Sequence, residues 1–390
     1  MNRSNMNSSR NAEIHTRQLC FFVAFLLPVS KLLEAPSLLA RFAAGDLLLP
    51  AFFHFLLESA VIALLLYASS RSEQTLFERM RSTFGKGVVF FYVLYGVYFL
   101  FAVLLPLLDF EKFAYAAFFD TAPTMFAFAS FFLFSAFACT KGLKAVGRSA
   151  DLCLILFLFP FLALMGMSLQ ETDFTALLPI LGTKFGDTVY AFTYTKPHFS
   201  DAVLLLPLLL HRRYQKGDGA KITASYWGGA VAVLLFLAVF FGIFSSIASR
   251  EHYAFSKTAQ YFSALSVVGR IDLLFVYALS IVLLFYTCLP LQYVTNVTAE
   301  LIGTDRKAPI STALNVLAFL FTLVCNKYYD SFYKIISGRL FWVFFIVADL
   351  LPVVLCLLLP KSEPKKRSQI KREKSGSQAK TSSIEEAPNA

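Results

Sequence analysis

The sequence predicts an all-α, polytopic membrane protein, and three observations carry this prediction. Hydrophobic residues make up 57% of the 390 residues, and charged residues only 15%. The mean hydropathy is +0.63, and a soluble domain of this length could not bury so much apolar surface. Apolar stretches of about 20 residues, which is the length of a helix that crosses about 30 Å of hydrocarbon, recur along the chain. A membrane β-barrel would instead show short segments of alternating polarity.

Hydropathy divides the chain into about ten spans between two polar tails. In chain order the expected spans are residues 17–42, 46–68, 87–108, 119–139, 145–168, 186–211, 225–247, 271–302, 308–328 and 337–360. Residues 1–16 are an N-terminal tail, and the first apolar stretch lacks an A-x-A cleavage site, so we expect a retained helix rather than a signal peptide. Residues 361–390 are rich in Ser and Lys without apolar periodicity, which predicts a disordered basic tail.

The positions of the basic residues orient the chain. Most of its 35 Lys and Arg residues fall in the two tails and in the loops that follow even-numbered spans. Loops rich in Lys and Arg stay in the cytoplasm, so both termini are predicted to be cytoplasmic. The net charge of +10 therefore reflects topology, and we expect no nucleic-acid partner.

Two of the spans are interrupted at matching places. Residues 26–36 of the first span and residues 194–201 of the sixth contain proline and charge where an apolar helix is otherwise expected. Lipid cannot satisfy the backbone groups that such a break leaves unpaired. Paired breaks in corresponding positions are typical of a transporter-type binding site. We therefore expect a transmembrane domain over 17–360 that consists of two five-helix repeats, 17–168 and 186–360.

Polar side chains at the two breaks are the candidate ligand-binding residues. They are Ser30, Lys31, Glu34, Thr195, Lys196, His198, Ser200 and Asp201, with Tyr95 of the third span at the edge of the expected cavity. A charge at the centre of a bilayer costs about 3 kcal/mol on insertion scales, so these side chains are expected to face the interior of the bundle.

Purely structural roles compete with ligand binding at each break. Lys31 and Glu34 are three residues apart on one helical face, so they could form a salt bridge that holds the bend, or Lys31 could snorkel to the membrane surface. Lys196, His198 and Asp201 could form a cluster that repairs the broken backbone. A contact between Lys31 and Asp201 across the two breaks is the sharpest hypothesis.

Polar and aromatic residues outside the breaks suggest further roles. His54 and Glu58 are one helical turn apart in the second span and could pair. Asp349 lies deep in the tenth span and could be a second functional carboxylate. Residues 72–85 have an apolar face that fits a cytoplasmic interfacial helix. The sequence has no phosphate loop, nucleophile motif, metal motif or paired-carboxylate site, so we expect neither an enzyme nor a cofactor.

Five short motifs resemble those of the GerAB-type family, the permease-like subunits of spore-germination receptors. They are Ile14 to Leu19 (IHTRQL), Thr75 to Lys86, Lys141 to Asp151, Ala176 to Leu181 (ALLPIL) and Arg270 to Phe275 (RIDLLF). The resemblance extends over about residues 14 to 360, and it rests on the order and spacing of the motifs together.

This resemblance implies a fold, a ligand class and partners. The fold would be that of amino acid–polyamine–organocation transporters, with LeuT-like inverted repeats and broken helices 1 and 6. The ligand would be a small molecule such as an amino acid. The partners would be a larger membrane receptor subunit and a lipoprotein subunit, in a bacterial cell membrane or spore inner membrane.

The breaks depart from the family pattern, and the departure leaves alternatives open. The first break contains no glycine, although close approach of backbone amides to a carboxylate favours glycine. Lys31 and Lys196 would repel an ammonium group unless Glu34 or Asp201 neutralises them. Besides a germinant receptor subunit, the chain could be a proton-coupled amino acid or amine permease, or a structural subunit whose cavity has degenerated.

Overall fold

The structure is a computed structural model that describes residues 14–72, 74–118, 125–210, 212–261, 272–336 and 340–359. Secondary structure in these residues is entirely helical. The N-terminal residues 1–13 and the predicted basic tail 361–390 lie outside the described residues.

The principal helices, with the short π- and 3-10 turns that join them at the breaks, follow one another along the chain. Their bounds are α2 (Thr16–Phe21), η1 (Phe22–Leu26), α3 (Leu27–Val29), η2 (Ser30–Leu32), α4 (Ala35–Ala43), α5 (Leu48–Ser70), α6 (Leu76–Phe84), α7 (Val88–Phe118), α8 (Met125–Lys141), α9 (Leu143–Ser168), α10 (Phe185–Thr195), η6 (Lys196–His198), η7 (Ala202–Leu204), α11 (Leu205–Leu209), α12 (Asp218–Phe244), α13 (Ala254–Gln260), α14 (Asp272–Ile302), α15 (Lys307–Lys327), α16 (Tyr329–Lys334), α17 (Phe341–Phe344), η11 (Phe345–Leu350) and α18 (Leu351–Leu358).

Seven helices of the described residues are long and apolar enough to cross a membrane, and one bent pair brings the number to eight. The all-α membrane architecture is therefore confirmed, but the count of ten spans is not. The two other expected spans coincide with α8, whose apolar part is shorter, and with the broken segment from α10 to α11. For these two segments, spanning remains a prediction.

The first span is broken where the sequence predicts. The π-turn η1 is followed by a single turn of α-helix that contains Pro28, and the 3-10 turn η2 ends at Leu32. Leu33 then leaves the helical region with φ −86° and ψ −94°. Pro36 stands near the start of α4, where its missing N–H has no helical partner to lose. The two halves of the span meet at 60°.

The sixth expected span breaks in the same manner. Helix α10 ends at Thr195, and the 3-10 turn η6 contains Pro197. Phe199 leaves the helical region, with φ −122° and ψ 54°, before η7 and α11 resume the helical path. Both breaks therefore follow from proline, which cannot continue a regular helix.

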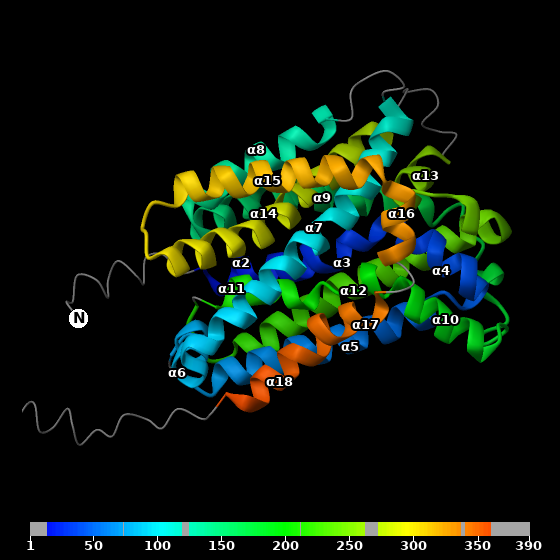
Figure 1. Cartoon of the computed structure of the whole chain (residues 1–390). Helices are drawn as coiled ribbons and strands as arrows, with labels where there is room; N and C mark the ends of the chain where they lie inside the picture. Colours follow the sequence, from blue (N-terminus) through cyan, green and yellow to red (C-terminus); the bar gives the residue numbers. More distant parts are fainter. Residues whose placement is uncertain are drawn as a thin grey trace, which may run out of the picture.

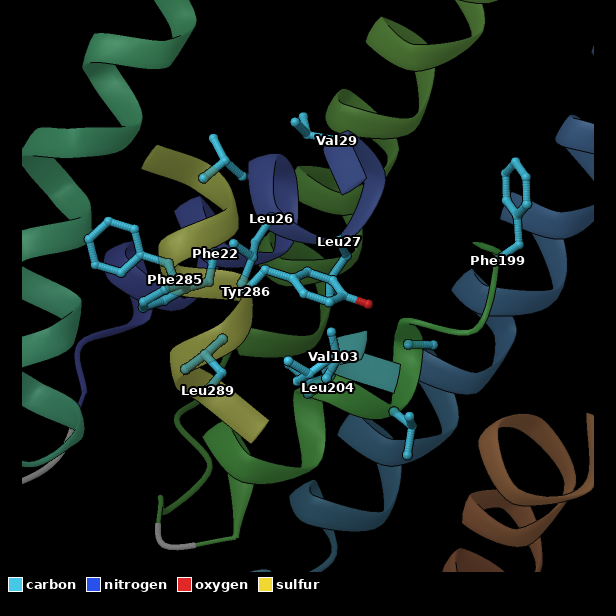
Figure 2. Packing of buried hydrophobic residues seen from close by; sticks show 14 of the residues in the cluster. Phe22, Leu26, Leu27, Val29, Val103, Phe199, Leu204, Phe285, Tyr286 and Leu289 are labelled. Atoms are coloured by element: carbon cyan, nitrogen blue, oxygen red, sulfur yellow. The ribbon is translucent and has the colours of Figure 1, made fainter. Parts of the chain in front are cut away.

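The long helices run alongside one another and enclose the first span (Figure 1). Helix α6 and the end of α18 lie at one end of the bundle, whereas α4, α10, α13 and α16 lie at the other. Helix α14 is central, since 89% of an apolar stretch of 18 residues within Tyr277–Ile302 is buried inside the protein. Figure 2 shows Phe22 and Leu26 of the first span packed near Phe285 and Leu289 of α14.

Helix α6 is the amphipathic helix expected over 72–85. It begins with a reciprocal capping box, in which Thr75 accepts a hydrogen bond from the N–H of Glu78 and the Glu78 carboxylate accepts one from the N–H of Thr75. Leu76 and Met80 on its apolar face are buried. The helix therefore packs against the bundle end rather than facing water on all sides.

Candidate functional site

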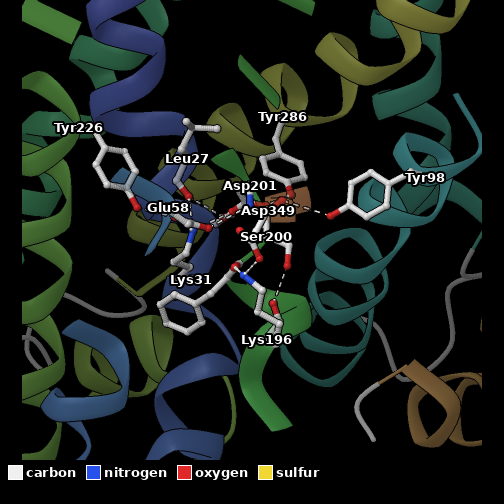
Figure 3. Close-up of polar contacts among 12 residues, drawn as sticks. Leu27, Lys31, Glu58, Tyr98, Lys196, Ser200, Asp201, Tyr226, Tyr286 and Asp349 are labelled. Atoms are coloured by element: carbon white, nitrogen blue, oxygen red, sulfur yellow. Dashed lines mark hydrogen bonds and ion pairs between the residues drawn. The ribbon is translucent and has the colours of Figure 1, made fainter. Parts of the chain in front are cut away.

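Lys31 and Asp201 meet between the two breaks (Figure 3). The Nζ atom of Lys31 lies 2.9 Å from Oδ2 of Asp201, and it also donates to the carbonyl oxygen of Leu27 at 2.8 Å. Only 1% of Lys31 and 4% of Asp201 is exposed. The contact predicted across the breaks is present, and snorkelling of Lys31 to the surface is excluded.

Glu58 of α5 joins this pair from a third element. Its carboxylate lies 3.5 Å from the Nζ atom of Lys31 and accepts hydrogen bonds from the backbone N–H of Asp201 at 3.0 Å and the Tyr226 hydroxyl at 2.5 Å. Glu58 is completely buried. The free backbone N–H that the second break creates is thus satisfied by a carboxylate from α5.

Asp201 accepts hydrogen bonds from two further side chains. The hydroxyl of Ser30 donates to Oδ2 of Asp201 at 2.6 Å, and the hydroxyl of Tyr286 donates to Oδ1 at 2.5 Å. Each donor comes from a different element, Ser30 from η2 and Tyr286 from α14. Asp201 therefore links both breaks to the central helix.

A second buried ion pair lies beside the first. The Nζ atom of Lys196 is 2.6 Å from Oδ2 of Asp349 and donates to the carbonyl oxygen of Phe199 at 2.8 Å. Neither carboxylate oxygen of Asp349 has a directed hydrogen bond among the described residues. The 2.6 Å contact is therefore a close but poorly aligned ion pair, and Oδ1 of Asp349 is left without a partner among the described residues.

We call Lys31, Glu58, Lys196, Asp201 and Asp349 the break cluster. All five are buried, and three carboxylates face two ammonium groups. Buried charges are tolerated when they are paired and hydrogen-bonded, and removing one partner from such a pair is strongly destabilising. If every group is ionised the cluster has one negative charge in excess, so it has room for one proton or one further cation.

Aromatic rings enclose Lys31 and the neighbouring His54. The rings of Phe199 and Phe55 lie 5.2 and 5.8 Å from the Nζ atom of Lys31, within reach of a cation–π contact. The ring of His54 stacks between Phe192 and Phe199, and its Nε2 atom is 3.1 Å from the hydroxyl of Thr195. The expected pairing of His54 with Glu58 is therefore wrong, because Glu58 faces Lys31.

Glu34 is not part of the break cluster. Because the helix ends at Leu32, the three-residue spacing between Lys31 and Glu34 does not place them on one face, and the predicted salt bridge between them is wrong. Glu34 instead lies 3.0 Å from the Nδ1 atom of His252. It lines a polar pocket of about 610 Å³ that also contains Arg41 and Lys112.

The predicted cluster of Lys196, His198 and Asp201 is also wrong. The three side chains diverge, since Lys196 reaches Asp349 and Asp201 reaches Lys31. The Nδ1 atom of His198 lies 4.0 Å from Asp109, and its buried Nε2 atom has no hydrogen-bond partner among the described residues.

The remaining candidates lie at the edge of the cluster. Ser200 donates its hydroxyl to the carbonyl oxygen of Lys196 at 2.8 Å, and Thr195 donates to that of Ala191 at the same distance. Tyr98 of α7, rather than Tyr95, contacts the second break, since its hydroxyl donates to the carbonyl oxygen of Ser200 at 3.2 Å. The Tyr95 hydroxyl is buried with no hydrogen-bond partner among the described residues.

The roles of Glu58, Tyr226 and Tyr286 are not evident from the sequence. The spacing of one turn favours His54 as the partner of Glu58, and tyrosines in apolar spans look like packing residues. A sequence signal for Glu58 exists, because a carboxylate inside an apolar span needs a partner from elsewhere in the bundle.

In the part of the chain that the structure describes, no three His, Cys, Asp or Glu side chains could hold a metal ion.

Comparison with known families matches residues 15–331 of this chain to the family described as spore germination protein. The chain belongs to this family. The match extends over most of the chain and includes both breaks. It identifies a membrane transporter or receptor protein rather than an enzyme, in agreement with the resemblance seen in the sequence.

The fold is similar to that of solved transporters. One is a Na⁺-coupled sialic acid symporter in a substrate-bound, outward-open state, with a TM-score of 0.57 and 10% sequence identity over 85% of this chain and 78% of the symporter chain. At this identity the similarity shows the fold alone, which is of the LeuT type. A comparison with curated proteins gave no significant match.

Proposed function

We propose that this chain is the membrane subunit of a nutrient-germinant receptor and binds a small polar ligand, such as an amino acid, at the breaks of spans 1 and 6. The observation that carries the proposal is the break cluster, in which both broken spans contribute a lysine to a buried network. Burial of five charges is costly in a membrane bundle, and intramembrane ionisable residues usually serve function.

The break cluster offers complementary groups for a zwitterion. A ligand ammonium would take the place of Lys31 beside Asp201 and Glu58, and a ligand carboxylate would pair with the displaced Lys31 or with Lys196. The desolvation of these groups has already occurred in the folded protein, so exchanging an internal partner for a ligand costs less than burying a bare charge. Binding would therefore loosen the contact between the two broken spans.

The signal would be this change in the relative position of spans 1 and 6. A ligand can shift the populations of two arrangements only if it binds one of them more tightly than the other. Here the ion pair between Lys31 and Asp201 would be intact in one arrangement and replaced by contacts with the ligand in the other.

From the family we further propose a larger membrane subunit and a lipoprotein subunit as partners. We propose that both termini are cytoplasmic, that the membrane is a bacterial cell membrane or spore inner membrane, and that 17–168 and 186–360 are the two repeats.

A proton-coupled amino acid or amine permease is the second candidate. It is favoured by the third carboxylate of the cluster, because a site with one negative charge in excess can accept a proton together with a neutral zwitterion. Asp349, whose Oδ1 atom has no hydrogen-bond partner in the described part of the chain, is the group best placed to accept that proton.

One experiment separates the two candidates. The purified full-length chain is screened with each proteinogenic amino acid for a rise in unfolding temperature, and every stabilising amino acid is tested for uptake into proteoliposomes with an imposed proton gradient. Stabilisation without uptake supports a receptor subunit, and stabilisation with proton-driven uptake supports a permease. Absence of stabilisation by any of the amino acids would overturn the proposed ligand class.

A further inference from the structure

A groove between three membrane spans lies beside the first break. It has a volume of about 500 Å³ and is lined by α2 to α3, α9 and α12. Its walls include Ala24, Phe25, Phe161, Leu162, Gly228 and Ala232, and Arg17 and Ser225 are the polar residues of the lining. The volume falls within the roughly 300–1,000 Å³ of small-molecule sites.

Two adjacent glycines of α12 create this groove. At Gly229 the helix lies directly against the first span, because a Cβ atom there would collide with the carbonyl group of Ala24 and with Pro28. At Gly228, one position earlier, a Cβ atom would meet no heavy atom within 4 Å beyond its own helix. Helix α12 therefore lies against the first span at Gly229 and leaves open space at Gly228.

The surroundings of the groove decide what fills it. Two walls belong to helices long and apolar enough to cross a membrane, and the third is the first half of the bent pair that passes this test as a whole, so we expect the groove to open to hydrocarbon. Water needs polar partners to occupy a cavity stably, and these walls offer almost none. A lipid acyl chain is the apolar occupant that a membrane supplies.

The charge at one end of the groove selects the lipid. The Arg17 side chain is 74% exposed and uses one guanidinium nitrogen to reach Asp151 at 3.0 Å. Asp151 also accepts a hydrogen bond from Gln18 at 3.2 Å, so Arg17 is not the only donor to this carboxylate. A guanidinium has five N–H donors and binds phosphate in a bidentate manner.

We infer that the groove is a binding site for one acyl chain of an anionic phospholipid whose phosphate is held by Arg17. This site is separate from the break cluster and does not depend on the proposed ligand. Its position on span 1 means that a bound lipid lies against the element that the proposed signal would move.

The test uses phosphatidylglycerol with a photoactivatable group in its acyl chain, and phosphatidylcholine with the same chain as the comparison lipid. The full-length protein is reconstituted with each lipid and irradiated, and the labelled peptides are mapped. We expect labelling of residues 157–162 and 228–233 by phosphatidylglycerol that exceeds labelling by phosphatidylcholine about fivefold, since one cation near a membrane surface contributes about 1 kcal/mol. Equal labelling by the two lipids would overturn the role of Arg17.

Matched variants locate the site. Gly228→Phe should fill the groove and abolish the labelling, whereas Gly166→Phe, at another helical glycine with open space around it, should leave it intact. Arg17→Gln should remove the preference for phosphatidylglycerol, whereas Arg81→Gln should not, although Arg81 is equally exposed and also paired, with Glu300 at 3.2 Å. Labelling that survives Gly228→Phe would overturn the inference.

Discussion

The Nζ atom of Lys31 lies 2.9 Å from the carboxylate of Asp201, although 170 residues separate them in the chain. Each residue stands at the break of a different interrupted helical segment. The contact therefore fixes the relative position of the two broken spans, and it does so with charges that lie inside the bundle.

Removing the lysine alone should destabilise the protein strongly. Lys31→Met leaves Asp201 and Glu58 buried without their shared cation, and breaking a buried pair from one side costs about 3–5 kcal/mol. The unfolding temperature of the purified protein in detergent measures the loss. Adding Asp201→Asn to Lys31→Met should recover part of it, since Glu58 keeps its hydrogen bonds from Tyr226 and from the backbone at 201.

The ion pair between Arg17 and Asp151 provides the comparison, since the Arg17 side chain is 74% exposed and that of Asp151 is 19% exposed. Asp151→Asn should change stability by no more than about 1 kcal/mol, because solvent around Arg17 screens this ion pair. A loss at Asp151 as large as that at Lys31 would contradict a special role for burial.

The two glycines of α12 should respond in opposite ways to the same substitution. Gly229→Ala forces a Cβ atom against the backbone of Ala24, and overpacking of this kind typically costs about 1–3 kcal/mol. Gly228→Ala meets open space and should stabilise the helix by about 0.5–1 kcal/mol. Unfolding temperatures of the two variants test this contrast, and equal destabilisation of both would refute the close approach at Gly229.

The link between His252 and Glu34 should make stability depend weakly on pH. The hydrogen bond to Glu34 raises the pKa of His252 above its ordinary value, with burial and Arg41 opposing the shift and Glu251 supporting it. The stabilisation is therefore fully present below about pH 6.5 and is lost as the pH rises through the raised pKa. Because the His252 side chain is 59% exposed, the effect should stay below about 1 kcal/mol.

Unfolding temperatures measured from about pH 6 to 8, the range in which histidine titrates, test this expectation. The wild-type protein should lose a little stability across the range, and His252→Gln should be flat. A rise in wild-type stability over the same range would show that the sign is wrong.

The sequence predicts the breaks and the contact between them because proline and charge in an apolar span have few structural solutions. Pro36 stands near the start of α4 and Pro197 lies just after the end of α10, and Lys31 and Asp201 need buried partners of opposite sign. These local constraints act over a few residues and can be read directly.

The partners from other helices could not be predicted, because they depend on how each helix is rotated in the bundle. Spacing of one turn favoured a pair between His54 and Glu58, but packing turns Glu58 toward Lys31 and leaves His54 between two phenylalanine rings. The assumption of a continuous helix likewise misplaced Glu34, because the break redirects the chain after Leu32. Tertiary packing decided each of these cases.

Removing the charge on Asp349 should show whether Asp349 accepts the proton in the proposed permease. Asp349→Asn keeps the shape but leaves Lys196 with the carbonyl oxygen of Phe199 alone, and it brings the cluster to two lysines and two carboxylates. If the chain is a proton-coupled permease, this variant should bind the amino acid but lose proton-driven uptake in proteoliposomes. Undiminished proton-driven uptake would show that the proton is accepted elsewhere.

The central claim is that the ligand exchanges with the ion pair between Lys31 and Asp201, and equilibrium binding of a radiolabelled amino acid tests it most directly. The amino acid is the one that stabilises the wild-type protein most, and it is titrated into wild type, the double variant Lys31→Met/Asp201→Asn and the surface variant Asp151→Asn. We predict saturable binding to wild type and to Asp151→Asn, and no binding to a folded double variant. Equal affinity for all three proteins would place the ligand elsewhere and contradict the account.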